Sequence, residues 1–249
     1  MSGPAPGVGL EAPLAQRHAR RGQDELRELV ERVAPTFAEA PAEAVTDWAA
    51  GEFGPHWALA ASMQDAVLID LVARRCPGID VLFLDTGYHF PETVETRAEV
   101  GRRYPVTVRD LRPEHTPAEQ DRVYGADLFA VDPDLCCLLR KSTPLFLALE
   151  GYEAWATGVR RAESSTRAGT ATIAFDEAHG IVKLAPLATW SDDDVARYAA
   201  EHDVVRNPLL DRGYPSIGCA PCTRPVAAGE DPRAGRWSGL GKTECGIHR

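Results

Sequence analysis

Near the start of the chain, apolar residues recur at helical spacing. Within residues 24–33, leucine and valine fall three or four positions apart, which predicts an amphipathic helix. A second short helix is expected over residues 42–50. Residues 1–22 carry glycine, proline and alanine without such a period, so we expect a flexible leader that ends where the first helix begins.

Short apolar runs then alternate with amphipathic stretches. Strands are expected at residues 57–62, 79–85, 105–111, 152–159 and 180–187. Helices are expected between them, at 66–75, at 91–104 and within 116–150, where the second helix carries a cysteine pair. The run 79–85 is apolar along most of its length, as in a strand buried on both faces. This alternation predicts an α/β fold with a doubly wound, mostly parallel sheet that binds ligands at the carboxyl ends of its strands.

In the last part of the chain, predicted strands and helices no longer alternate. Ser191 and Asp194 have the spacing of a capping box, which predicts one more helix, beginning at residue 192. After Asn207 the pattern changes to turns. We therefore expect residues 23–225 to form the α/β domain and residues 226–249, rich in glycine and charge, to form a mobile tail.

The composition is that of an ordinary soluble protein, with 44% hydrophobic and 26% charged residues among 249. No apolar run approaches the ~18 residues that span a membrane, and the N-terminal residues lack the apolar segment of a secretory signal, so a cytoplasmic protein without membrane contact is expected. The net charge of −10 disfavours nucleic-acid binding, which requires a basic face. An anionic ligand would have to be small and held by a local group of cations.

Four cysteines form two pairs, Cys136 with Cys137 and Cys219 with Cys222. Thiolates are soft donors, and four that converge suit zinc or an iron–sulfur cluster. Neighbouring helical side chains diverge by about 100°, so an adjacent pair reaches one small ion only with strain, whereas a cluster offers separate iron corners. The pattern favours a cluster over structural zinc. The alternative without metal is four reduced cysteines buried for packing.

The other two cysteines differ from each other. Cys76 stands where a helix should end, before Pro77, and we expect it to be buried without a chemical role. Cys245 lies near the C-terminus in a segment without apolar periodicity, so packing does not explain it. It is either an incidental exposed thiol or, as we favour, a reactive cysteine on a mobile arm. The uneven spacing of the cysteines argues against a disulfide framework.

Polar residues follow two of the predicted strands. Ser62 comes after the first strand and precedes a helix, where it either binds a phosphate or caps the helix. Asp85, Thr86 and Gly87 end the second strand and turn the chain where a ribose or base could lie. The carboxyl ends of parallel strands meet at one edge of the sheet, which is where nucleotides bind.

Cations gather in a third such segment. Arg160, Arg161 and Arg167 follow the fourth strand. A loop of this kind is usually a solvated surface, but three arginines directly after a strand in an acidic protein favour an anion clamp.

Further cations flank the cysteine motifs. Lys141 lies four residues after Cys137, on the same side of a helix, and can project toward the metal site. Arg233 and Arg236 precede Cys245 and could stabilise its thiolate together with a bound anion.

Together these segments resemble a known family. The motifs LDTGYHFPET, CC-x-x-R-K, GVRR, C-x-x-C, RAGRW and ECGIH are similar to those of assimilatory adenylyl-sulfate reductases, within the phosphoadenylyl/adenylyl-sulfate reductase family. The resemblance covers nearly everything after the leader. The combination of CC, C-x-x-C and ECGIH is highly specific, whereas LDTG and the arginine loop are shared more widely. The resemblance implies an adenine nucleotide alpha-hydrolase-like fold of the PP-loop type.

The resemblance also implies roles for the cysteines and cations. Cys136, Cys137, Cys219 and Cys222 would ligate one 4Fe–4S cluster, and Cys245 would attack the sulfur of adenylyl sulfate and release AMP. Thioredoxin would reduce the resulting S-sulfocysteine and liberate sulfite, in the sulfate assimilation that leads to cysteine biosynthesis. The substrate-binding residues would be Ser62, Asp85, Thr86, Gly87, Lys141, Arg160, Arg161, Arg167, Arg233, Arg236 and His248.

The alternatives differ in what they require. Enzymes that use the 3′-phosphorylated nucleotide generally lack the cluster cysteines, so the cysteines here favour adenylyl sulfate over a 3′-phosphoadenylyl-sulfate or dual-substrate reductase. An ATP-using adenylating enzyme of similar fold would need a glycine-rich S-G-G-x-D-S loop, whereas this chain has the short SMQD. A zinc-stapled nucleotide sensor would leave Cys245 incidental. Glu163 stands where the family commonly has glutamine. Besides thioredoxin, a second copy in a homo-oligomer is a possible partner.

Overall fold

The computed structural model describes residues 20–242 and 244–248, and of His248 only the backbone. Most of the expected leader, residues 1–19, lies outside the described residues. The described strands form one sheet in the order β3-β2-β1-β4-β6-β5. They are β1 (Trp57–Ala61), β2 (Asp80–Leu84), β3 (Thr107–Leu111), β4 (Ala154–Thr157), β5 (Ile173–Asp176) and β6 (Ile181–Leu184). Neighbouring strands run parallel except β5, which pairs antiparallel with β6.

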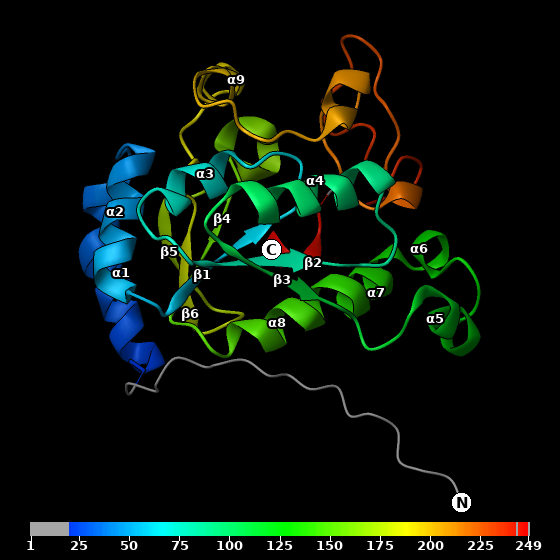
Figure 1. Cartoon of the computed structure of the whole chain (residues 1–249). Helices are drawn as coiled ribbons and strands as arrows, with labels where there is room; N and C mark the ends of the chain where they lie inside the picture. The colour runs from blue at the N-terminus through cyan, green and yellow to red at the C-terminus, as the bar shows by residue number, and fades with distance from the viewer. Residues whose placement is uncertain (1–19, 243, 249) are drawn as a thin grey trace, which may run out of the picture.

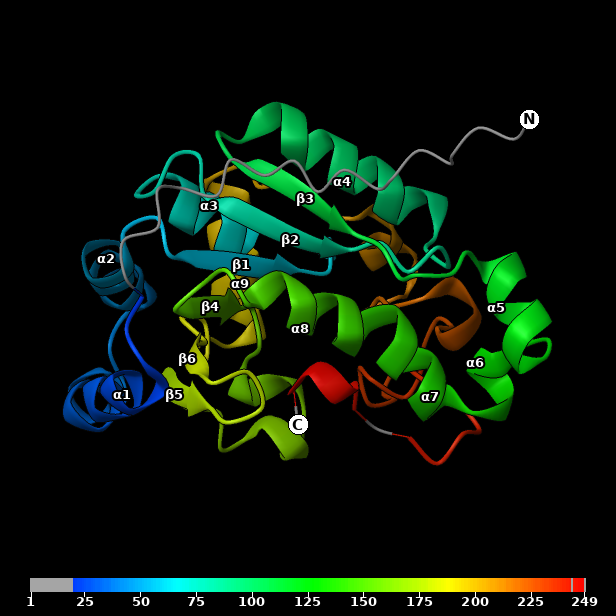
Figure 2. The ribbon, with the colours of Figure 1, turned by 90° about the horizontal axis from the view of Figure 1, so that it is seen from below.

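Helices cover both faces of this sheet. Figure 1 shows α3 (Val67–Ala73), α4 (Pro91–Arg103) and α9 (Asp192–Glu201) above it and α8 (Thr143–Leu149) below it. Figure 2, seen from below, shows α8 in front of the strands. The remaining helices lie at the two ends of the sheet: α1 (Gln23–Phe37), α2 (Ala42–Phe53), α5 (Pro117–Tyr124), α6 (Leu128–Val131) and α7 (Pro133–Cys137). The doubly wound, mostly parallel fold predicted from the sequence is confirmed.

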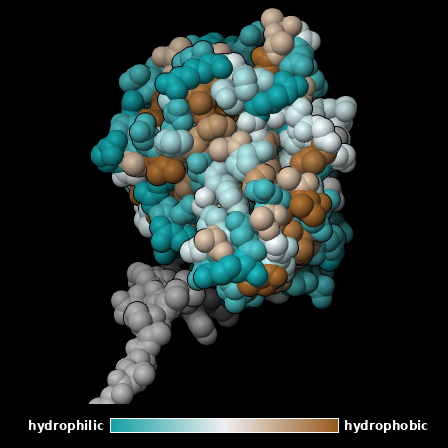
Figure 3. Space-filling model, turned by 90° about the vertical axis from the view of Figure 1, so that its right-hand side faces the viewer, coloured by the Kyte–Doolittle hydropathy of each residue, from teal (hydrophilic) through white to brown (hydrophobic). Residues whose placement is uncertain are grey.

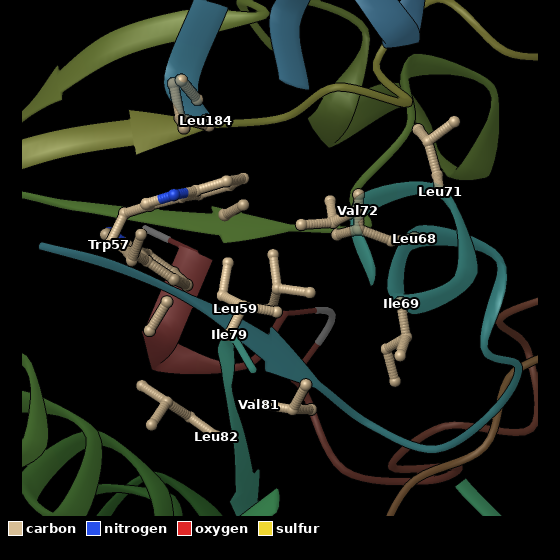
Figure 4. Packing of buried hydrophobic residues seen from close by; sticks show 14 of the residues in the cluster. Trp57, Leu59, Leu68, Ile69, Leu71, Val72, Ile79, Val81, Leu82 and Leu184 are labelled. Carbon is tan, nitrogen blue, oxygen red and sulfur yellow. The ribbon is translucent and has the colours of Figure 1, made fainter. Parts of the chain in front are cut away.

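The core forms between the sheet and α3. The side chains of β1, β2 and α3 gather in one buried cluster (Figure 4). Every residue of α3 is buried, which explains why its sequence is apolar nearly all round. On the surface at the α5–α7 end, hydrophobic residues are interspersed with hydrophilic ones (Figure 3), as on most soluble domains. Within the described residues, no helix combines the length and the apolar character that crossing a membrane requires.

Most of the predicted elements are present, and two details differ. The sequence reading missed β5, a four-residue edge strand whose pairing with β6 no local pattern announces. The stretch 116–150 divides into four α-helices with a π-helix at Leu138–Ser142, and the cysteine pair lies on the third of them, α7. The predicted capping box is confirmed, because the Asp194 N–H donates to Ser191 Oγ at 3.1 Å and the Ser191 N–H donates to Asp194 Oδ2 at 2.9 Å.

Two described segments near the ends of the chain contact the domain more closely than the sequence suggested. Arg21, expected in the flexible leader, pairs with Glu153 at 2.6 Å and with Glu52. In the tail, Trp237 is 2% exposed and Cys245 is 7% exposed. The structure therefore shows the tail docked against the domain, whereas the composition had suggested an open arm.

Candidate active site

A cavity of about 330 Å³ opens at the carboxyl ends of β1 and β4. The chain runs from β1 through β2 to β3 on one side and from β4 to β6 on the other, so the strand order reverses here. Such a reversal leaves a crevice between the loops, which is the usual ligand site of open α/β sheets. Ala61 and Ser62 line it after β1, and Gly158, Val159 and Arg160 line it after β4.

One part of the cavity wall is apolar and another part is charged. Leu68 and Ile69 of α3 and Phe83 of β2 supply apolar surface, which suits a planar base. The tail and the loop before the second cysteine pair close the opposite side, with Arg233, Arg236, Trp237, Cys245 and the segment 215–219. Apolar side chains, several cations and a thiol therefore line the same cavity.

The loop after β1 is held by side chains rather than by glycines. Ser62 lines the cavity, as predicted, while Met63 is buried with a φ of 60°. This left-handed conformation is unfavourable for methionine, and Asn207 Nδ2 supports it by donating to the Met63 carbonyl at 3.2 Å. At the head of α3, Asp65 rather than Ser62 accepts a backbone N–H, from Val67 at 3.0 Å. Burial raises the pKa of Asp65.

The turn after β2 does not reach the cavity. Thr86 is fully buried, and its hydroxyl lies 3.3 Å from Cys219 Sγ. Its carbonyl accepts from Arg140 Nε at 2.6 Å. Gly87 has a φ of 72°, and a Cβ there would lie 3.1 Å from the Arg140 guanidinium. Asp85 pairs instead with Arg112 at 3.1 Å. Asp85, Thr86 and Gly87 do not line the cavity, and their turn braces the cysteine site. Their contact with a ribose or base stays a prediction.

In the loop after β4, two neighbouring arginines point in different directions. Arg160 lines the cavity and pairs with Asp192 at 2.7 Å. Arg161 points away from it and donates to the Thr170 carbonyl at 2.8 Å and to Glu39 at 2.7 Å. Arg161 therefore ties the loop to the end of α1 and does not line the cavity, and its role in an anion clamp stays a prediction.

Arg167 and Arg233 meet a carboxylate of the tail. Glu244 accepts from Arg167 at 2.8 Å and from Arg233 at 3.1 Å, and Arg167 also pairs with Glu163 at 2.6 Å. Burial would raise the pKa of Glu244, but the hydrogen bond and charge of Arg167, with the charge of Arg233, lower it to about 2. Burial and the nearby charge of Arg167 lower the pKa of Arg233.

Cys245 lies beside Cys137 and among cations. The Cys137 thiol donates a hydrogen bond that lowers the pKa of Cys245 to about 5, assisted by the charges of Lys141 and Arg236, although burial opposes the shift. The same hydrogen bond, with burial, raises the pKa of Cys137. Burial lowers the pKa of Lys141, but the electrostatic effect of the neighbouring cysteines, Cys219 first and then Cys245, outweighs it and the net shift is upward. Lys141 therefore remains a cation here.

Arg236 is the other cation at the thiol. It donates to Ser216 Oγ at 3.2 Å and lies 4.5 Å from the ring centroid of Trp237. Its Nε is buried and has no hydrogen-bond partner among the described residues. A Cβ at Gly218 would lie 2.3 Å from this guanidinium, so glycine is needed there. Burial lowers the pKa of Arg236. A buried, under-satisfied guanidinium that faces the cavity is suited to an anionic ligand.

The four paired cysteines line a second, smaller cavity behind Lys141. Cys136 and Cys137 come from α7, and Cys219 and Cys222 from the turn at Ala220–Cys222. All four are free thiols. Burial raises the pKa of Cys136, and it raises that of Cys222 to about 11. Thiols in this state become good ligands when a metal supplies the positive charge that favours the thiolate.

The chemistry of this donor set suits a group that binds thiolates. Four cysteines line one small cavity, and cysteine sulfurs are the ligands of iron–sulfur clusters and of many structural zinc sites. The residues present are compatible with an iron–sulfur cluster.

Several residues that line the cavity were not predicted from the sequence to be site residues. Asp192 and Glu163 bring carboxylates to a cavity expected to be cationic, and Trp237 anchors a tail expected to be free of packing. The lone tryptophan in a glycine-rich segment was the available signal. The side chain of His248, a predicted substrate contact, lies outside the described residues.

Known protein families and known proteins are similar to this chain. The family model described as "Phosphoadenosine phosphosulfate reductase domain" matches residues 55–225. Proteins named adenosine 5′-phosphosulfate reductase are similar over most of the chain. The one from Mycolicibacterium smegmatis is 53% identical, covering 91% of this chain and 96% of its own. The one from Streptomyces coelicolor is 54% identical, covering 92% of this chain and 97% of its own.

Solved structures share the fold. The phosphoadenylyl-sulfate reductase of Candida auris, in a phosphate complex, has a TM-score of 0.67 at 28% identity and covers 80% of this chain and 97% of its own. The FMN adenylyltransferase of Candida glabrata, with FAD and pyrophosphate, has a TM-score of 0.55 at 12% identity and covers 84% of this chain and 79% of its own. At that identity the second likeness is one of fold alone.

The two directions of the arginines predict different effects on anion binding. Arg236→Ala should weaken the binding of inorganic pyrophosphate roughly tenfold or more, because a charge-assisted contact contributes about 1.5–3 kcal/mol. Arg161→Ala should leave it within about twofold, the range of substitutions away from a site, while lowering the melting temperature. Calorimetric titration measures the first effect and a thermal scan the second. Equal losses of affinity would contradict the assignment.

Proposed function

The chain belongs to the phosphoadenosine phosphosulfate reductase domain family, and from that membership we propose that it reduces adenosine 5′-phosphosulfate to sulfite and AMP in sulfate assimilation. One observation carries the proposal: Cys245 lines a nucleotide-sized cavity with Lys141 and Arg236 close by. The relatives that are about half identical are named for this activity. Reductive chemistry on a sulfur anion needs a thiolate and cations at one place, and both are present.

The cavity suggests how the substrate lies. The adenosine occupies the apolar crevice between β1 and β4, near Ser62, and its phosphosulfate points toward Lys141 and Arg236. Arg160 and Arg233 also line the cavity and are close enough to its rim to add positive charge. The substrate role of His248 stays a prediction.

The reaction then needs two exchanges at sulfur. The Cys245 thiolate attacks the sulfur of the phosphosulfate, an S–S bond forms, and the S–O bond to AMP breaks with its electron pair on the phosphate oxygen. Lys141 and Arg236 stabilise the charge that develops there. An external dithiol attacks Cys245 Sγ and sulfite leaves. The second thiol of that reductant restores Cys245 as the reductant becomes a disulfide. We assign the reductant to thioredoxin.

Thiolate formation at Cys245 does not depend on Cys137 alone. A free cysteine has a pKa near 8.5 and is mostly protonated at neutral pH. When Cys137 serves as a metal ligand it no longer donates, and Lys141 and Arg236 remain to lower the pKa of Cys245. The nucleophile is thus activated by cations that also bind the substrate.

The cysteine quartet supports a resident cofactor. Cys136, Cys137, Cys219 and Cys222 would hold one 4Fe–4S cluster, which supplies a structural brace and an electrostatic contribution beside Lys141. Thiol–disulfide exchange supplies the two electrons that the reduction needs, so the cluster would not have to transfer electrons. Reduced thiols and a cluster suit a cytoplasmic location.

The cofactor assignment predicts a selective loss of metal. Cys137→Ser should lose iron and unfold at a lower temperature, because metal binding is coupled to folding. Cys76→Ser is the matched control, since Cys76 lies after α3 and outside both cavities, and it should keep its iron. Iron analysis and the visible spectrum of anaerobically purified protein measure both. Full iron content in Cys137→Ser would remove it as a ligand.

The nucleophile assignment predicts a covalent adduct. Cys245→Ser should keep its iron and still bind AMP, yet release no sulfite, because a reductant can act only on a covalent intermediate. Wild-type protein given substrate without reductant should gain the mass of one sulfonate group on the peptide that contains Cys245. An adduct on another cysteine would overturn the mechanism.

The acidic lining predicts which nucleotide is preferred. Glu163 and Asp192 line the cavity and already pair with Arg167 and Arg160, which leaves these cations less able to bind a further phosphate group. We expect kcat/KM for adenosine 5′-phosphosulfate to exceed that for its 3′-phosphorylated form at least about tenfold, or ~1.4 kcal/mol. Steady-state assays on both nucleotides decide this, and equal values would favour the dual-substrate alternative.

A further inference from the structure

The tail is attached to the domain at two residues that precede Cys245. The first is Lys242, whose Nζ donates to Asp134 Oδ1 at 2.6 Å and to the Pro133 carbonyl at 3.3 Å. Its side chain is 3% exposed and lies over the ring of Trp237, 5.6 Å from the centroid. This contact joins the tail to the start of α7, the helix that carries Cys136 and Cys137.

The second attachment is Glu244, directly before Cys245, which joins the tail to the loop that carries Arg167. Its carboxylate accepts from Arg167 Nη2 at 2.8 Å, Arg167 Nε at 3.0 Å and Arg233 at 3.1 Å. The hydroxyls of Thr166 and Ser164 donate to the same carboxylate at 2.9 and 3.4 Å. The Glu244 side chain is 13% exposed. Two guanidinium groups and two hydroxyls therefore satisfy one carboxylate that is largely removed from solvent.

The two contacts have opposite polarity, and this fixes the register of the tail. A cation at 242 meets an acidic residue of α7, and an anion at 244 meets a basic loop. Sliding the tail along this path would bring like charges together, which is costly in a partly buried setting. Next to Cys245, a Cβ at Gly246 would lie 3.2 Å from Ser142 Oγ, so the tail passes close to the helix that bears Lys141. The chain on either side of the thiol is thereby held in place.

We propose that Lys242 and Glu244 form a latch that positions Cys245 over the cavity and keeps its thiol out of solvent. Lys242 and Glu244 are positioning residues, and Arg167 binds the tail rather than the substrate. Opening the latch exposes the thiol to an external reductant, which cannot reach a residue that is 7% exposed. The kinetic consequence rests on the proposed function, whereas the effect on exposure of Cys245 does not.

The first test measures the accessibility of the thiol in the metal-loaded protein. Glu244→Gln keeps the shape of the side chain and removes its charge, so iodoacetamide should alkylate Cys245 at least about tenfold faster, given the strength of charge-assisted hydrogen bonds. Rates are taken on the plateau of each variant's pH profile, where the thiol is fully ionised, so that a change in its pKa does not contribute. Peptide mass spectrometry assigns the alkylated cysteine.

Two further variants separate the latch from general loosening. Glu230→Gln breaks another ion pair of the same C-terminal segment, with Arg224 at 3.1 Å, away from the cavity, and should change the rate by no more than about twofold. Glu244→Asp keeps the charge and should restore part of the protection. Unchanged alkylation in Glu244→Gln, or an equal rise in Glu230→Gln, would overturn the latch.

The second test asks what the latch does for the reaction. Single-turnover formation of the sulfonate adduct should slow in Glu244→Gln while the Kd for AMP stays unchanged. Faster adduct formation with a lower KM would mean that Glu244 competes with the substrate for the arginines, and would overturn the positioning role. If wild-type protein forms no adduct but the alkylation rates still respond to Glu244→Gln, the proposed function fails and the latch stands.

Discussion

The site depends on how buried cations are compensated. Lys141 and Arg236 lie inside the protein, where an unpaired charge is costly. Carboxylates pair with Arg160, Arg167 and Arg233, whereas the groups that favour charge on Lys141 are the neighbouring cysteines. The positive charge of Lys141 is therefore compensated by sulfur, with Cys245 as the thiol whose pKa is lowered. An anionic substrate enters the same balance, which explains how a protein of net charge −10 can bind one.

The fold brings these groups together from distant parts of the chain. The reversal of strand order between β1 and β4 leaves the crevice, while the π-helix at Leu138–Ser142 presents Lys141 to both cavities. A π-turn widens the helix where it occurs and is frequent at functional sites. Here it directly follows the helix that carries the adjacent cysteines. The cysteine site and the nucleotide cavity thus share one cation, and the structure of one constrains the electrostatics of the other.

The sequence predicted the strands that surround the site better than it predicted the directions in which the side chains point. Apolar runs identified β1, β2, β4 and β6 because these strands are largely buried and mostly apolar. The strand β3 was also predicted although it is partly exposed, whereas β5 needs its partner β6 to be recognised. Arg160 and Arg161 are neighbours in sequence, yet one lines the cavity and the other meets Glu39 and the Thr170 carbonyl. Local pattern cannot separate them, because their directions are set by groups far away in the chain. The same holds for Thr86, which the fold turns toward Cys219.

The tail shows why composition alone was misleading there. It has no apolar periodicity, but Trp237 packs in a small buried cluster with Cys137, Cys245, Cys222, Leu240 and Ile247, and Arg236 and Lys242 lie over its ring. The attachments made by Lys242 and Glu244 also differ in strength. Asp134 is 65% exposed, so its pair with Lys242 is screened and contributes little, while Glu244 is enclosed by several donors. A tail held by a few polar contacts, rather than by a large apolar face, is stable enough to place a nucleophile and weak enough to release it. That combination is what a thiol needs if it must react first with a buried substrate and then with a second protein.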